Sequence, residues 1–542
     1  MRYVFILLLS ALSAGTALAA ELRQPLPGVH AIVGVRVVTE PGEVLESATI
    51  VVRDGVVEAV GADVAPPADA EIIEFERGDD QPPLTVYPGL IDPYLAVGAD
   101  EEGDGTDDEA PAVPGRHPLV RPDRTLDAAA WPAETVDAHR RAGFTTALMA
   151  PSAGLLRGRS LLANLGAGGL SANLLTTDVA QHAHLHERHP DGEYPQSLMG
   201  SVALFRQTLL DAGWQARARD AWNDNPAQAR PDWLPGMDAL APVLAGDQPL
   251  VFEARDALDS LRILELVDED VDLVLVGHGE EYKRLEDFDR RVPHILPLDF
   301  PSAPDVADEN DRDVSLEALR HWRRAPDNPI RLIEAEFPVL FTAHGQSNPT
   351  DLFQHVATAV ERGLDADRAL AALTTAPAEW LGIADRAGRI AEGTMANLVI
   401  VDGELFTENP TISEVWVDGH RFELAKLEPP AVDPAGTWRL TLGSVGGMGD
   451  LDAELVLTGE PTSLEGSMSV MGNELTVTQG RVSGKQVRLE FNVGGSGTIT
   501  VNLDVEGERV RGNGSGPYGE FTVRGERAGP PGETSGDEET RT

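Results

Sequence analysis

The side chains best suited to chemistry in this sequence are one glutamate and two histidines that stand at the ends of short apolar segments. They are Glu253, at the end of Leu250–Glu253, His278, just after Asp272–Val276, and His344, just after Val339–Thr342. A carboxylate and two imidazoles can hold one metal ion, or can act without a metal as acid and base groups. The alternative is that each side chain only fills space or forms a hydrogen bond in a pocket that does no chemistry.

A second group of histidines is closely spaced along the chain. It consists of His182, His184, His186 and His189. Alternate residues of a strand face one side, so this spacing can create a zinc or nickel site. The polar residues that follow His186 are typical of an exposed loop, and the sequence favours that interpretation for the group. His182 directly follows an apolar segment and is the member expected to point into the interior of the fold.

Composition narrows the chemistry further. The chain has 542 residues and no cysteine, which excludes thiolate nucleophiles, zinc–thiolate sites and disulfides. A net charge of −46 disfavours nucleic acids and anionic membrane surfaces as partners. Such acidity is also typical of proteins from saline habitats. No G-x-S-x-G segment is present, so the sequence gives no support to a serine-hydrolase mechanism.

The elements that position these side chains lie between residues 84 and 395. Short apolar segments alternate there with amphipathic ones, which predicts parallel strands connected by helices and, most commonly, a barrel. The predicted strands are Thr145–Met149, Leu250–Glu253, Asp272–Val276, His294–Leu298 and Val339–Thr342. The predicted helices are Glu134–Ala142, Ser197–Trp222, Ala257–Val267 and Leu352–Arg362.

Both flanks of this section are predicted to be rich in strands. The flanking strands are Val29–Val38, Ala48–Arg53, Val56–Val60, Asn397–Val401 and Ser413–Val417. Segments 21–83 and 396–428 are therefore expected to form one composite β domain. Residues 434–527 alternate apolar and polar side chains between glycine turns, which predicts an antiparallel meander, either a small barrel or a sandwich. Trp438 is expected to anchor its core.

The two ends of the chain differ from the domains. Residues 1–20 resemble a secretory signal peptide, with Arg2, an apolar stretch and the cleavage pattern Ala17-Leu18-Ala19. No later segment is apolar enough to span a membrane. We therefore expect an exported bacterial protein, periplasmic or secreted. Residues 528–542 lack apolar side chains and are expected to be disordered.

Three segments resemble the imidazolonepropionase-like branch of the amidohydrolase superfamily. They are 48–61 with 86–92, then Arg141–Thr146, and finally 369–403, which includes Gly388-Arg389-Ile390-Ala391-Glu392-Gly393 and Asn397-Leu398-Val399-Ile400-Val401-Asp402. The resemblance covers roughly residues 30–425. It implies an α/β fold: a TIM-like (β/α)8 barrel, a composite β-sandwich domain from both flanks and a C-terminal antiparallel β domain. It also implies a metal-dependent hydrolase of carbon–nitrogen bonds other than peptide bonds.

The ligand positions that the resemblance implies are altered in this sequence. Members of the family read P-G-L-I-D-x-H-x-H at the first barrel strand, and here Tyr94 and Ala96 stand at the two histidine positions. Glu253 stands where a histidine is expected after strand five. His278 comes two residues late for strand six, and His344 replaces the aspartate that removes a proton from the metal-bound water. No lysine precedes Lys283, which excludes the subtype with a carboxylated lysine.

Two interpretations of function remain open. In the first, the metal-dependent reaction is lost, no cofactor is needed, and the protein is a binding or partner subunit. It then forms a homo-oligomer or associates with an intact paralogue. In the second, a rebuilt site hydrolyses an amide-type small molecule, with His344 and Glu253 as catalytic groups. His182 and His278 are then the ligands of a single divalent metal such as zinc, or the site works without one. Asp92 is expected to brace its strand in both.

Overall fold

The computed structural model describes residues 28–75, 83–98, 116–126, 131–186, 192–301, 314–346, 348–407, 410–424, 431–443, 449–461, 463–492, 498–516, 519 and 521–529. The predicted signal peptide, His189 and residues 530–542 lie outside these residues. Residues 528 and 529, which were expected to be disordered, instead end strand β26 (Phe521–Gly529). The chain divides into two compact units. The larger comprises most of residues 28–424, and the smaller is mainly the segment after residue 425.

The flanking strands form one sheet, which is built from both ends of the larger unit. Its order is β18-β17-β16-β5-β1-β2-β3, and β4 pairs with β1. The strands are β1 (Val29–Glu40), β2 (Glu43–Arg53), β3 (Val56–Gly61), β4 (Glu71–Glu74), β5 (Thr85–Pro88), β16 (Leu398–Asp402), β17 (Thr411–Val417) and β18 (His420–Glu423). A sandwich of two sheets was expected. The long β1 instead pairs with β2 along one edge and with β4 and β5 along the other. All eight strands therefore belong to one continuous sheet.

The middle section contains two further sheets. One has the order β10-β9-β7-β6 and the other the order β15-β14-β13-β12-β11-β8. Their strands are β6 (Leu90–Val97), β7 (Phe144–Pro151), β8 (Leu156–Arg159), β9 (Leu161–Asn164), β10 (Leu174–Thr176), β11 (Gln181–His184), β12 (Leu250–Glu253), β13 (Leu273–Val276), β14 (His294–Pro297) and β15 (Val339–Thr342). The pairs from β11 to β15 are parallel, as is β6 with β7. Closure of these strands into a single barrel stays a prediction.

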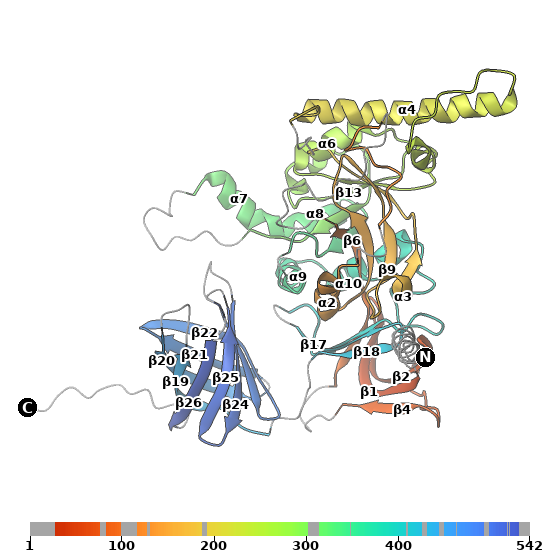
Figure 1. Ribbon diagram of the computed structural model, residues 1–542. Coiled ribbons are helices and arrows are strands. Elements are labelled where there is room, and N and C mark those ends of the chain that lie inside the picture. Colours follow the sequence, from red (N-terminus) through yellow and green to blue (C-terminus); the bar gives the residue numbers. More distant parts are fainter. Residues whose placement is uncertain are drawn as a thin grey trace, which may run out of the picture. The chain divides into compact units, whose positions relative to one another are not determined.

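Helices lie beside these strands (Figure 1). They are α2 (Ala133–Arg141), α3 (Leu170–Asn173), α4 (Leu198–Asp224), α5 (Ala241–Leu244), α6 (Ala257–Leu266), α8 (Asn328–Glu334), α9 (Asp351–Glu361), α10 (Ala366–Leu373) and α11 (Thr375–Trp380). The four predicted middle helices are confirmed as α2, α4, α6 and α9. A continuous apolar core holds this unit together and includes Phe144, Phe205, Phe252 and Phe341, which are all fully buried.

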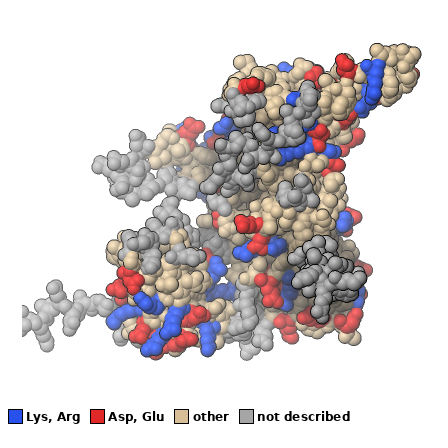
Figure 2. Space-filling view, in the orientation of Figure 1, with Lys and Arg blue, Asp and Glu red and all other residues tan. Residues whose placement is uncertain are grey.

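The longest helix, α4, buries only one side. Ser197 caps its N-terminus by accepting a hydrogen bond from the backbone N–H of Gly200. Its buried residues, Ser201, Phe205, Thr208, Ala212 and Gln215, recur every three or four positions and therefore lie on one face. Part of the helix projects from the larger unit, and Figure 2 shows much uncharged surface there. In the part of the chain that the structure describes, no helix combines the length and apolarity needed to cross a lipid bilayer.

The smaller unit contains a closed eight-stranded barrel, as one of the two sequence alternatives predicted. Its antiparallel strands are β19 (Gly436–Gly443), β20 (Leu451–Glu460), β21 (Ser463–Val470), β22 (Asn473–Ser483), β23 (Gln486–Asn492), β24 (Thr498–Glu506), β25 (Arg509–Ser515) and β26 (Phe521–Gly529). Apolar side chains, including Trp438, Leu489 and Phe491, fill its interior. Trp438 also donates from its indole Nε1 to the carbonyl oxygen of Pro434 at 2.8 Å, which confirms its anchoring role.

Candidate functional site

The candidate site is built on β6, the strand that carries the altered motif. Asp92 and Tyr94 lie two residues apart on this strand and are both fully buried. Asp92 accepts hydrogen bonds from the Thr342 hydroxyl at 2.6 Å and from the Tyr94 backbone N–H at 3.0 Å. Its other oxygen lies 3.4 Å from Nε2 of His139. Because Thr342 belongs to β15, Asp92 ties the two middle sheets together, which agrees with the predicted bracing role.

The acidity of Asp92 follows from these contacts. Burial raises the pKa of its carboxyl, but the neighbouring His139 ring and the hydrogen bond from Thr342 outweigh burial. The pKa of Asp92 therefore lies below its usual range. Oδ1 accepts the hydrogen bonds from Thr342 and from the Tyr94 backbone, whereas Oδ2 is buried, has no hydrogen-bond partner among the described residues and faces the His139 ring.

The centre of the site is a cluster of Tyr94, Arg157 and Glu253. The Arg157 guanidinium, on β8, donates from Nη1 to Glu253 Oε2 at 2.6 Å and to the Tyr94 hydroxyl oxygen at 2.9 Å. The Tyr94 hydroxyl donates to the same Glu253 oxygen at 3.0 Å. Arg157 is almost completely buried and Glu253 largely so. The three side chains form a closed ring of charge-assisted hydrogen bonds, which is stronger than bonds between neutral groups.

Charge explains the protonation states in this cluster. Burial raises the pKa of Glu253. The Arg157 charge, followed by those of His184 and His344, lowers it by more than burial raises it, and the resulting pKa of Glu253 is about 2. Burial raises the pKa of the Tyr94 hydroxyl, and the Glu253 carboxylate adds to that effect. At neutral pH the site therefore holds an ionised carboxylate, a guanidinium and a neutral phenol, and its two charges cancel.

Two of the predicted histidines lie against the Tyr94 ring. The ring centroid of His182 is 5.7 Å from that of Tyr94, and the centroid of His344 is 4.9 Å away. Burial, followed by the Arg157 charge, lowers the pKa of His182 to about 3. Burial also lowers the pKa of His344. Both imidazoles are thus neutral at pH 7, and neither ring nitrogen of His182 has a hydrogen-bond partner among the described residues.

Other predicted residues lie elsewhere. His278 follows β13, and its Nε2 is 3.6 Å from Oε1 of Glu281, which is fully buried. His186 is hydrogen-bonded through Nε2 to the Asp259 carboxylate on α6, and its ring lies 5.6 Å from that of His184. The structure therefore brings together His182, Glu253 and His344 around Tyr94, and places His278 in a different set of contacts. The displacement follows from its position two residues beyond the end of its strand.

The residues present do not fit the catalytic metal that the altered motif implies. Among the described residues, no group of three or more histidine, aspartate or glutamate side chains is arranged to hold a metal ion. Ala96 has no donor atom, and the Tyr94 hydroxyl and Glu253 are both bonded to Arg157. A guanidinium so close to a carboxylate also repels a second cation. We therefore derive no step through a metal at this site.

Arg157 is the functional residue that the sequence analysis missed. It lies in the short segment Leu156–Arg159 and carries no motif signal, because arginine supplies almost all of the cations in this chain. Only the pairing of β8 with β11 and of β11 with β12 places it beside Glu253. A buried charged side chain is costly to keep without a partner, so the burial of both groups points to their pairing.

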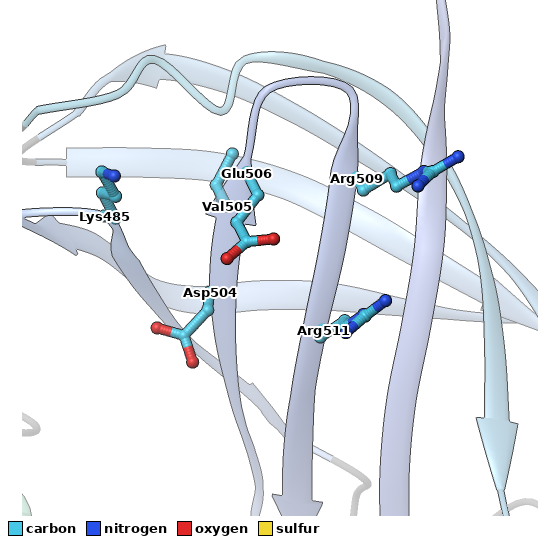
Figure 3. Close-up of a pocket in the computed structure, with 6 residues that line it drawn as sticks. All are labelled: Lys485, Asp504, Val505, Glu506, Arg509 and Arg511. Atoms are coloured by element: carbon cyan, nitrogen blue, oxygen red, sulfur yellow. The ribbon is translucent and has the colours of Figure 1, made fainter.

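A hollow lies at the surface of the C-terminal barrel. It encloses about 200 Å³ and is lined by Lys485, Asp504, Val505, Glu506, Arg509 and Arg511. Figure 3 shows Asp504 and Glu506 between Lys485 on one side and Arg509 and Arg511 on the other. Arg509 also pairs with Glu526 at 3.3 Å. A rim of mixed charge selects neither anions nor cations, so we assign this hollow no function.

Comparison with known proteins agrees with the fold. The model of the Amidohydrolase family matches residues 330–422. The chain is 36% identical over 245 residues to "Amidohydrolase tasK" of Hapsidospora irregularis, a match covering 44% of this chain and 24% of that protein. The chain thus spans about a quarter of that curated relative's length. A solved amidohydrolase from Thermotoga maritima MSB8 superposes with a TM-score of 0.57 at 20% identity, covering 73% of this chain and all of that one. Residues 330–422 are thus similar to the Amidohydrolase family, and the larger unit has the fold of a solved amidohydrolase.

Proposed function

We propose that this protein is an exported, non-catalytic member of the amidohydrolase superfamily, of the imidazolonepropionase-like branch, and that it acts as a binding or partner subunit. One observation carries the proposal: the Arg157 guanidinium is bonded to Glu253 and Tyr94 where the family motif would place metal ligands. The fixed positive charge of Arg157 takes the electrostatic place of a metal ion. Unlike a metal, a guanidinium cannot bind and activate a water molecule.

The proposed binding partner also follows from the loss of the metal ligands. A barrel-like unit that keeps its core without its reaction can serve an intact paralogue, or retain an amide-type small molecule without cleaving it. Export rests on the signal-like segment 1–20, which lies outside the described residues. Nucleic acid is not proposed as a partner, because a chain of net charge −46 repels phosphates.

The second candidate function is a metal-free hydrolase that uses the barrel-mouth side chains. It is favoured by the convergence of His182, Glu253 and His344 around the Tyr94 ring. The charges argue against it. A histidine whose pKa is about 3 is a weak base at pH 7, and a carboxylate whose pKa is about 2 and which is paired with arginine is weaker still. Of these three side chains, His344 is the one that would act as the general base.

The two candidates are separated by turnover measurements on the full chain. We expect no hydrolysis of a panel of cyclic amides and N-acyl amino acids above the buffer rate, with or without added zinc. His344→Ala should leave this baseline unchanged. Hydrolysis by the wild-type chain that falls roughly 100-fold or more in His344→Ala would match the loss of a general base and would establish the second candidate. Thr358→Ala, on α9, is the control for unspecific effects of substitution.

A further inference from the structure

The outer face of α4 combines apolar and charged side chains that lie three, four or seven residues apart. It consists of Met199, Arg206, Leu210, Trp214, Arg217, Asp220 and Asp224. All seven are exposed, and they lie opposite the buried face of the helix. Met199 is 80% exposed, Leu210 61% and Trp214 47%. Large apolar side chains are seldom left in water in such a row unless another surface covers them.

The charges on this helix are unusual for this protein. α4 carries three arginines and three aspartates, whereas the whole chain has a net charge of −46. The helix is therefore one of the places where two copies of this acidic chain can meet without net repulsion. Among the described residues, neither Arg206 nor Asp220 takes part in an ion pair within its own chain.

The positions of the charges select the partner. Arg206 and Asp220 lie seven residues on either side of Gly213, so an antiparallel second copy centred at Gly213 brings Arg206 of each chain opposite Asp220 of the other. Leu210 and Trp214 lie within about one turn of that centre and would cover each other. Twofold symmetry makes every such contact twice. We propose that α4 is the homodimer interface of this protein, with a second copy of the chain as its occupant.

The exposed area is consistent with that occupant. From their exposed fractions, Met199, Leu210 and Trp214 offer roughly 400 Å² per copy, about half of the ~800 Å² that each partner buries in an interface of standard size. The flanking polar residues of a helix of 27 residues can supply the remainder. Dimerisation through α4 does not require the loss of activity proposed above, so failure of either proposal leaves the other standing.

Sedimentation velocity of the full chain tests this proposal, in 0.15 M NaCl over a range of protein concentrations. We expect a concentration-dependent dimer for the wild type. Leu210→Glu and Arg206→Asp should each raise the dimer Kd at least about tenfold, because they place a buried charge or a like-charge pair at the interface twice. The double variant R206D/D220R exchanges the two charges and should restore the Kd to within about threefold of the wild type.

Leu316→Glu is the matched control. Leu316 on α7 (Leu316–Arg324) is also 61% exposed, but it lies on another helix and its substitution should not change the Kd. Thermal melts identify any variant that fails to fold. Three results overturn the proposal: a wild-type chain that stays monomeric at 100 µM, an unchanged Kd in Arg206→Asp, or a folded R206D/D220R variant that remains monomeric. A monomeric wild-type chain would mean that the outer face of α4 binds a different protein instead of a second copy.

Discussion

Arg157→Met is expected to destabilise the larger unit by about 3 kcal/mol, since it leaves the Glu253 carboxylate largely buried without its partner. Arg157 donates to Glu253 at 2.6 Å and to the Tyr94 hydroxyl at 2.9 Å, so two bonds are lost at once. Methionine fills a similar volume, which limits the contribution of a cavity. Denaturant unfolding followed by circular dichroism measures the change.

The neighbouring arginine on the same strand provides the control. Arg159 pairs with Asp178 at 2.8 Å, but both side chains are partly exposed, so Arg159→Met should cost less than about 1 kcal/mol. Glu253→Gln alone should also destabilise the protein, because it removes the carboxylate that neutralises the buried Arg157 charge. The double variant R157M/E253Q should be more stable than the sum of the single changes predicts. Equal effects of Arg157→Met and Arg159→Met would contradict a central role for Arg157.

The triple variant Y94H/A96H/R157A is expected to gain a zinc site. The first two substitutions restore the histidine spacing of the family motif on β6, and the third frees Glu253 from its guanidinium. Together with His182 or His344 this gives the three or four nitrogen and oxygen donors that zinc prefers, so we expect about one zinc ion per chain. Elemental analysis after dialysis measures the zinc content, and circular dichroism checks the fold.

Comparison with Y94H/A96H isolates the effect of Arg157. With Arg157 retained, its charge and its bond to Glu253 should hold zinc retention at the background of the dialysis buffer. If both variants retain zinc equally, Arg157 does not keep metal out. If the triple variant keeps its fold and binds none, the donors around Tyr94 are not placed as we describe.

Much of the fold could be predicted because its signals are local. Segments such as Leu250–Glu253 and Val339–Thr342 are short apolar runs, and they form β12 and β15 with the predicted bounds. In the C-terminal barrel, β21 and β25 have weak local signals. Ser463–Val470 and Arg509–Ser515 contain glycine and several polar residues, so their alternation of apolar side chains is weak. Their neighbours in the closed barrel, rather than local propensity, fix them as strands.

The site was predicted less completely, because its contacts depend on residues that are far apart in the sequence. Glu253 and His344 were predicted at or just after strands, and His182 just after an apolar segment. Tyr94 was predicted only as a replaced ligand of the family motif, and the structure brings all four together. Arg157 could not be predicted, since only the long-range pairing of β8, β11 and β12 brings it to Glu253. His278 shows that even two residues beyond a strand end suffice to turn a side chain toward other partners, here Glu281.

The zinc content of the wild-type chain tests the central claim most directly. The purified protein is dialysed against a chelator, then against excess zinc and finally against metal-free buffer, before elemental analysis. If the Arg157–Glu253 pair has taken the place of the metal, no zinc above the buffer background should remain, and added zinc should not change the melting temperature. About one tightly held zinc ion per chain, lost in Glu253→Gln, would contradict the account.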